Sequence, residues 1–201
     1  VLRLLAKCTQ HRRRLPPELC VFIAIEIARG LAFAHQVPTS LAGVAGTAFL
    51  VHGDISPANF MLGETGHVKL IDFGIADAGG LSTGPRSLRG KMGYMSPEVV
   101  LGREIDARSD LFSLAIVLWE MLTLKRLFKA EDDTETLRNI VEVRTEGRFA
   151  RHDYVPAPLL AIIARALARE PDQRHQSATA LAEDLNGWSP SELLVVMGVH
   201  V

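Results

Sequence analysis

The sequence predicts an α+β fold that is mainly helical, with a small amount of β-hairpin structure. Helices are expected to predominate because apolar residues recur every three or four positions along the longest stretches of the chain. The β-structure is expected in short apolar stretches, two of them on either side of a turn near Glu64. The chain has 201 residues, 48% of them hydrophobic and 22% charged, which is enough for one domain with a sizeable core.

The N-terminal part is expected to form two helices. Val1–Gln10 is mildly amphipathic and is followed by the basic run His11–Arg14, which suits a solvated helix end or an anion-binding patch. Pro16–Glu18 is typical of a helix start, because proline is tolerated in the first turn and an acid suits the dipole there. Apolar residues then repeat at helical spacing and predict one buried face: Ile23, Ile27, Leu31 and Ala34.

The middle of the chain alternates loops with short strands. Val37–Gly46 contains a proline and two glycines and is expected to be a loop. Phe60–Leu62 and Val68–Ile71 are expected to be strands joined by a turn at Gly63–Gly66, and a further short strand is expected before them, at Phe49–Val51. The Gly- and Ser-rich stretch from residue 76 to 93 predicts a long loop, and such loops in compact domains are usually functional.

After Pro97 the chain is expected to be helical. Asp110–Thr123 is apolar on nearly every side, which predicts a helix buried almost all round. Three amphipathic helices are expected to follow it, the last one ending at Asn186-Gly187: Thr134–Thr145, Pro158–Arg169 and Ala178–Leu185.

Charge and cysteine content argue against several function classes. The net charge of −1 gives no basic footprint for nucleic acid. Cys8 and Cys20 lack Cys-x-x-Cys spacing and are expected to be free thiols in a reducing, cytoplasmic setting. The apolar stretch at residues 193–201 is too short to span a membrane. The seven histidines are scattered without a pair four residues apart, so no zinc site is expected.

Two short motifs carry the chemistry: His52-Gly53-Asp54-Ile55-Ser56-Pro57-Ala58-Asn59 and Lys69-Leu70-Ile71-Asp72-Phe73-Gly74. A carboxylate such as Asp54 can accept the proton of an attacking hydroxyl. Asn59 and Asp72 offer the oxygen ligands that magnesium prefers. Phe73 is expected to pack behind Asp72, and Gly74 to let the backbone turn.

This ordered set resembles the catalytic loop and Asp-Phe-Gly turn of eukaryotic-type serine/threonine protein kinases, in particular bacterial ones. The resemblance implies a catalytic loop at residues 52–59 and an activation segment at 72–98. It implies phosphoryl transfer from ATP, with Mg²⁺, to Ser or Thr hydroxyls of a protein substrate. Asp54 would position the hydroxyl, while Asn59 and Asp72 would hold the metal and nucleotide. His52 would be a packed structural residue, and Met61 would form the floor of the adenine pocket.

Downstream residues extend the resemblance. Gly93–Glu98 resembles the end of the activation segment, and Asp110 the residue that anchors the catalytic-loop backbone. Arg174 resembles the residue that pairs with Glu98, and that pair is expected to be structural. The resemblance covers residues 1–188, as a kinase-like C-terminal lobe, and leaves a short tail at 189–201.

Two substitutions depart from the family pattern near the catalytic loop. Gly53 replaces an Arg that usually grips a phosphorylated activation loop, so phosphorylation at Ser82, Thr83 or Ser87 is not expected to be the main on-switch. Ser56 replaces a Lys that contacts the γ-phosphate, whereas Lys91 stands where a Thr is usual. We expect that the positive charge has moved to Lys91 and still stabilises the transferred group; an exposed and unpaired Lys91 is the alternative.

A third departure concerns the N-terminal lobe. These 201 residues contain no Gly-x-Gly-x-x-Gly loop and no strand Lys paired with a helix Glu. We expect upstream sequence to supply that β lobe, and the chain alone to transfer little phosphate.

Two other functions stay open. Aminoglycoside-type small-molecule phosphotransferases share the His-Gly-Asp…Asn loop but lack elements like Gly93–Glu98 and the Asp110 helix. A pseudokinase or adaptor is favoured by the missing lobe, whereas intact Asp54, Asn59 and Asp72 argue against it. Ser56-Pro57 differs from the loop typical of tyrosine kinases, which favours Ser/Thr acceptors.

Overall fold

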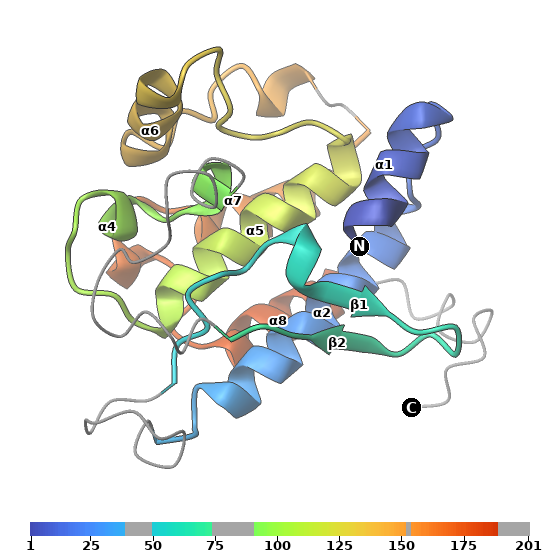
Figure 1. Ribbon diagram of the computed structural model, residues 1–201, viewed down its shortest axis with the longest axis horizontal. Helices are drawn as coiled ribbons and strands as arrows, with labels where there is room; N and C mark the ends of the chain where they lie inside the picture. The colour runs from blue at the N-terminus through green and yellow to red at the C-terminus, as the bar shows by residue number, and fades with distance from the viewer. Residues whose placement is uncertain (39–49, 74–90, 152–153, 189–201) are drawn as a thin grey trace.

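The computed structural model describes residues 1–38, 50–73, 91–151 and 154–188 (Figure 1). Within these residues the fold is mostly helical, as predicted, with one two-stranded sheet. The helices are α1 (Leu2–Gln10), α2 (Pro17–Ala34), α4 (Pro97–Val100), α5 (Ala107–Thr123), α6 (Asp133–Val141), α7 (Ala157–Ala166) and α8 (Ala178–Trp188). Short 3₁₀ turns lie at Pro57–Asn59, Met92–Tyr94, Phe149–Arg151 and Pro171–Gln173.

Helix α5 is the centre of the fold and, as predicted, is buried nearly all round. It packs against α2, α7 and α8, and Figure 1 shows it crossing the middle of the molecule. The helix begins three residues earlier than predicted because Asp106 caps it, accepting a hydrogen bond from the Arg108 backbone N–H at 2.7 Å. Its central position lets α5 hold residues from distant parts of the chain in fixed places.

The other long helices complete the core around α5. Helix α2 contributes apolar residues along its length and packs most extensively on α8. The expected end of α6 at Thr145 was wrong, because Val143 adopts a left-handed φ of 48° that no α-helix accommodates. The expected end of α7 at Arg169 was also wrong, since that helix ends at Ala166, whereas α8 ends at Trp188, directly after the expected Asn186-Gly187.

The predicted hairpin is present. Strand β1 (Phe60–Leu62) pairs antiparallel with β2 (Val68–Leu70), with Phe60 opposite Leu70. Gly66 closes the turn with a φ of 84°, a conformation that favours glycine. The strand expected at Phe49–Val51 was wrong where it can be judged: Leu50 and Val51 are not in a strand, although the Leu50 N–H donates to the Val37 carbonyl at 3.0 Å. Phe49 lies outside the described residues.

Both cysteines are buried free thiols, as predicted. Burial, with smaller contributions from Cys8 and Glu18, raises the pKa of the Cys20 thiol to about 12, so this side chain is an inert part of the core. Across the described residues, every helix is too short or too polar to cross a membrane.

Candidate functional site

Asp110, in the first turn of α5, anchors the loop that carries Asp54. Its Oδ2 accepts the backbone N–H of His52 at 2.8 Å, and its Oδ1 accepts that of Gly53 at 2.9 Å. Gly53 has a φ of 72°, a left-handed conformation that lets the loop bend between these two contacts. The side chain of Asp110 is 2% exposed, so these charge-assisted bonds form away from water. The loop therefore takes its position from the central helix.

His35 also binds Asp110, and sequence reasoning assigned it no role. Its Nε2 lies 2.8 Å from Asp110 Oδ2, so α2 and α5 hold the loop together. His35 is the C-cap residue of α2 and lies 75 positions from Asp110 in the sequence. No local pattern connects two residues so far apart, which is why the contact was missed.

His52 links the two motif loops. Its Nδ1 accepts the Asp54 N–H at 3.2 Å, and its Nε2 lies 3.1 Å from the Ile71 carbonyl oxygen. These partners require a neutral ring protonated at Nε2. Burial lowers the pKa of His52, outweighing the opposite effect of Asp110 and other neighbours. The ring also packs on Phe73 with centroids 4.5 Å apart, so His52 is a packed residue rather than a base.

Asn59 fixes the shape of the Asp54 loop. Its Nδ2 donates to the Asp54 carbonyl at 2.7 Å and to the Asp54 carboxylate Oδ2 at 2.8 Å. Both bonds use the amide nitrogen, which leaves the amide oxygen to act as a ligand. Asp54 itself is half-buried, so its carboxylate can meet a substrate at the surface.

Asp72 follows the residue that ties the second motif loop to the first. The Ile71 N–H donates to the Asn59 carbonyl at 3.0 Å, directly after β2. Asp72 is exposed and has a φ of 59°, a conformation that costs on the order of 1 kcal/mol for a residue other than glycine. Gly74, expected to ease this turn, lies outside the described residues. Within the described ranges no three His, Cys, Asp or Glu side chains form a ready metal site.

Lys91 contacts the Asp54 loop from 37 positions further along the chain. Its Nζ donates to Asp54 Oδ2, the oxygen that also accepts from Asn59. The alternative of an unpaired Lys91 is therefore wrong, although its side chain is 42% exposed. Ser56 is buried nearby in the chain, and its hydroxyl has no hydrogen-bond partner among the described residues. The loop thus has the buried hydroxyl of Ser56 at the position where the family has a lysine. The positive charge next to Asp54 comes instead from Lys91.

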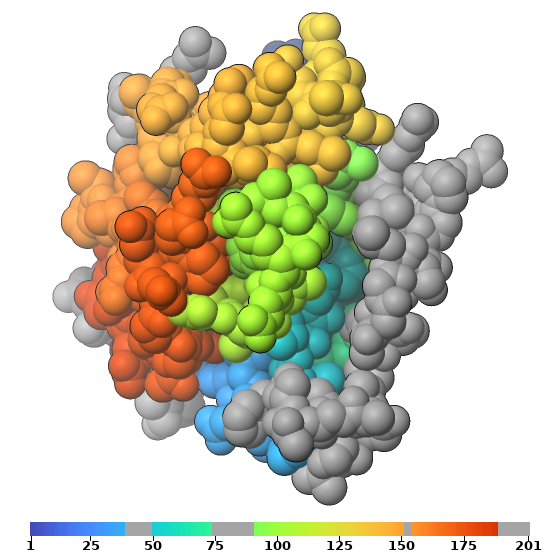
Figure 2. Space-filling model, turned by 90° about the vertical axis from the view of Figure 1, so that its left-hand side faces the viewer, coloured from blue at the N-terminus to red at the C-terminus, as the bar shows by residue number. Residues whose placement is uncertain are grey.

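Glu98 and Arg174 form the expected buried pair. Arg174 Nη1 and Nη2 donate to the two carboxylate oxygens at 2.7 and 2.8 Å, and the Ser109 hydroxyl adds a third bond at 2.5 Å. Burial alone would raise the pKa of Glu98, but these bonds outweigh it and lower that pKa to about 2. Figure 2 shows the face on which α4, in green, lies beside the orange segment that contains Arg174.

A second anchor holds the turn at Met92–Tyr94, and sequence reasoning missed it. The Tyr94 hydroxyl donates to Glu120 at 2.5 Å and accepts from Arg126 Nη1 at 2.7 Å. The Ser113 hydroxyl donates to the Tyr94 carbonyl at 2.7 Å. Burial, reinforced by Glu120, raises the pKa of Tyr94, so the phenol stays protonated. The turn that follows Lys91 is therefore fixed to α5.

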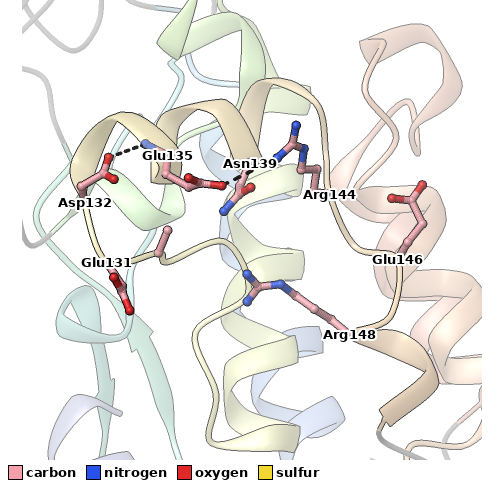
Figure 3. Close-up of a pocket in the computed structure, with 8 residues that line it drawn as sticks. Glu131, Asp132, Glu135, Asn139, Arg144, Glu146 and Arg148 are labelled. Atoms are coloured by element: carbon pink, nitrogen blue, oxygen red, sulfur yellow. Dashed lines mark hydrogen bonds and ion pairs between the residues drawn. The ribbon is translucent and has the colours of Figure 1, made fainter.

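Met61 and a hollow beside α6 complete the description. Met61 in β1 is 54% exposed, as a pocket floor open to a ligand would be. A hollow of about 450 Å³ lies beside α6, and Figure 3 shows Glu135 paired with Arg144 and Asp132 bonded to the Glu135 backbone. Acidic residues outnumber basic ones in its lining, and none of its residues belongs to the two motif loops.

Known proteins resemble this chain over most of its length. The sequence profile described as protein kinase domain matches residues 2–185. The tyrosine-protein kinase MasK of Myxococcus xanthus is 37% identical over 186 residues, which are 92% of this chain and 28% of that protein. The serine/threonine-protein kinase PknB of Mycobacterium tuberculosis is 33% identical over 184 residues, 88% of this chain and 28% of that protein. A probable serine/threonine-protein kinase of Streptomyces coelicolor is 33% identical over 177 residues, 86% of this chain and 25% of that protein. The chain thus spans about a quarter of the length of these relatives.

Proposed function

Because this chain belongs to the protein kinase domain family, we propose that its protein transfers the γ-phosphoryl group of MgATP to Ser or Thr hydroxyls of protein substrates. The observation that carries the proposal is the convergence of Asp54, Asn59 and Asp72 on two loops tied by the Ile71–Asn59 bond. An acceptor carboxylate beside two oxygen ligands is the arrangement that phosphoryl transfer needs.

Asp54 is proposed to orient the attacking hydroxyl and accept its proton. Lys91 and Asn59 both donate to Oδ2, which leaves Oδ1 to face the acceptor. Lys91 and Asn59 would thus orient the Asp54 carboxylate through Oδ2, while Oδ1 contacts the substrate hydroxyl. The loop would not need to reorganise during the reaction, because Asp110 already holds its backbone.

Magnesium fits the residues present. The uncommitted amide oxygen of Asn59 and the exposed carboxylate of Asp72 are hard oxygen donors, and magnesium typically takes one or two protein ligands with waters and phosphates. When bound, the ion would neutralise charge on the phosphates of ATP. Asn59 and Asp72 would hold it, and Met61 would lie under the base of the nucleotide.

Lys91 is proposed to take over the electrostatic role of the family lysine that Ser56 replaces. Its contact with Asp54 places a positive charge next to the acceptor group, where negative charge develops during transfer. The Ser56 hydroxyl that stands at the position of the family lysine is buried and has no hydrogen-bond partner among the described residues.

A protein acceptor is favoured over a small molecule. Small-molecule phosphotransferases of the aminoglycoside type lack the Gly93–Glu98 element, whereas here Glu98 is locked to Arg174 and Tyr94 to α5. Ser/Thr specificity is supported by the names of PknB and the Streptomyces relative, while the name of MasK states tyrosine. The loop sequence Ser56-Pro57 favours Ser/Thr.

The test is the Asp54→Asn variant of the intact protein, assayed with labelled ATP, magnesium and separate Ser, Thr and Tyr peptides. We expect Ser or Thr phosphorylation to fall by a factor of about 10² to 10⁴, with little change in nucleotide affinity. The matched control is Asp172→Asn, which removes the same charge from a carboxylate that is 91% exposed and remote from both motif loops. Equal activity of Asp54→Asn and the control would overturn the assignment, and tyrosine labelling alone would overturn the acceptor class.

A further inference from the structure

The N-terminal end of the chain is far more basic than the rest. Residues 1–17 contain five Arg and Lys residues and no Asp or Glu. The whole chain has 22 Arg and Lys against 23 Asp and Glu, so the remaining residues carry a formal charge of −6. A nearly neutral protein thus concentrates positive charge on α1 and the turn after it, at one edge of the molecule (Figure 1).

These basic side chains are exposed and have no carboxylate partner in the part of the chain that the structure describes: Arg3, Lys7, His11, Arg12, Arg13 and Arg14. Elsewhere on the surface Arg29, Arg108 and Arg165 are each paired with an Asp or Glu. The contrast matters, because unneutralised charges attract an anionic partner more strongly than paired ones do.

The basic residues border a shallow, largely apolar hollow. Lys7, Cys8, His11 and Arg13 surround a space of about 480 Å³ where α1 ends. This volume exceeds that of a single phosphate group and leaves room for the residues that flank it. The almost fully buried Cys8 contributes to this apolar lining.

The turn that shapes the hollow is rigidly held. The His11 N–H donates to the Lys7 carbonyl and the Arg13 N–H to the Cys8 carbonyl, each at 2.9 Å. Arg12 between them has a left-handed φ of 51°, the conformation that glycine usually provides at a helix end. The Arg14 guanidinium then stacks on the Tyr154 ring, 3.7 Å from its centroid. Arg12 thus occupies a backbone conformation that would favour glycine.

We propose that this hollow binds the phosphate of a phosphoserine or phosphothreonine in a protein chain. Such a phosphate carries nearly two negative charges near neutral pH and three acceptor oxygens, which match the Lys7 and Arg13 donors. A concave site with room for flanking residues suits one protruding phosphate on a peptide, whereas a flat bilayer surface would meet only the outermost side chains.

Binding is measured on the intact protein without nucleotide, so the result does not depend on phosphoryl transfer. The probe is a fluorescent neutral peptide with one central phosphoserine, titrated by anisotropy at fixed ionic strength. The comparison ligands are the unphosphorylated peptide, inorganic phosphate as competitor, and vesicles with and without phosphatidylserine. We expect at least about tenfold weaker binding of the unphosphorylated peptide, and displacement by millimolar phosphate.

The decisive variant is Lys7→Gln with Arg13→Gln, matched by Arg29→Gln with Arg165→Gln, which removes the same charge elsewhere. All four residues are exposed, so both variants are expected to keep the wild-type melting temperature. The first should weaken phosphopeptide binding by about tenfold or more and the second by less than about twofold. Equal losses in both variants, or binding to phosphatidylserine vesicles but not to the phosphopeptide, would overturn the proposal.

Discussion

Lys91 brings a positive charge to Asp54 from 37 residues away in the sequence. Exposed ion pairs of this kind add little to stability, usually under about 1 kcal/mol. We therefore expect Lys91 to contribute to catalysis rather than to stability. Bound substrate would exclude water from the site, and there a cation stabilises the negative charge that develops during phosphoryl transfer more strongly than it would in water. Activity and stability should respond differently when the charge is removed.

Replacing Lys91 by Ala is expected to lower kcat by about 10²-fold, the cost of losing one preorganised electrostatic contact. The free energy of unfolding, measured by urea titration, should stay within about 0.5 kcal/mol of the wild-type value. The Ser56→Lys, Lys91→Thr double variant should regain most of the lost rate, since it restores a cation from the other loop. A double variant as slow as Lys91→Ala would contradict relocation of the charge.

Glu98 makes stability depend on acid. Its pKa in the folded protein is lowered to about 2, from 4.5, so its contribution is fully present above about pH 4.5 and is lost as pH falls toward 2. The difference corresponds to at most about 3 kcal/mol. Urea unfolding between pH 5 and 3 should therefore show a falling midpoint. In Glu98→Gln, which cannot titrate, that fall should be smaller while stability at pH 7 is lower. If Glu98→Gln lost stability between pH 5 and 3 as wild type does, the Glu98 carboxyl would not be a main cause of the acid-dependent loss of stability.

At the scale of elements, the sequence pattern predicted the hairpin and the helices, whose formation depends mainly on neighbouring residues. The hairpin followed from its turn and its two apolar strands, and α5 from apolar residues that recur at helical spacing on nearly every side. Helix ends were less predictable, because the left-handed Val143 at the end of α6 is set by packing rather than by propensity. The motif residues were identified by their order and spacing and by the resemblance to protein kinases, and their catalytic roles stay predictions. Their long-range partners, His35 above all, depend on tertiary contacts that no local pattern encodes.

A further prediction concerns phosphorylation of the expected activation segment, and it is based mainly on the sequence. Ser82, Thr83 and Ser87 lie outside the described residues, but Gly53 is described and has no side chain to grip a phosphate. The end of the segment is already fixed through Tyr94 and Lys91. Alanine at all three positions of the intact protein should therefore leave peptide phosphorylation within about threefold of wild type. Loss of activity, with wild-type stability, would show that phosphorylation of this segment is the on-switch after all.

At the scale of the whole molecule, α5 unifies the site. It holds the loop at residues 52–59 through Asp110, the turn after Lys91 through Ser113 and Glu120, and Glu98 through Ser109. Three segments that are distant in sequence thus share one rigid support. These 201 residues contain no Gly-x-Gly-x-x-Gly loop, the element that covers the phosphates of ATP in protein kinases.

The isolated 201-residue chain is therefore expected to fold but to transfer phosphate at least about 10³-fold more slowly than the intact protein. Asp54, Asn59 and Asp72 would be in place, whereas ATP would be held from one side only, and positioning supplies much of the rate in phosphoryl transfer. Parallel assays of both proteins with MgATP and the same Ser peptide measure the ratio, and matching far-UV circular dichroism of the helical core checks folding. If the deficit reflects missing nucleotide contacts, it should appear as a raised KM for ATP as well as a lower kcat. Equal rates would show that these residues suffice for catalysis.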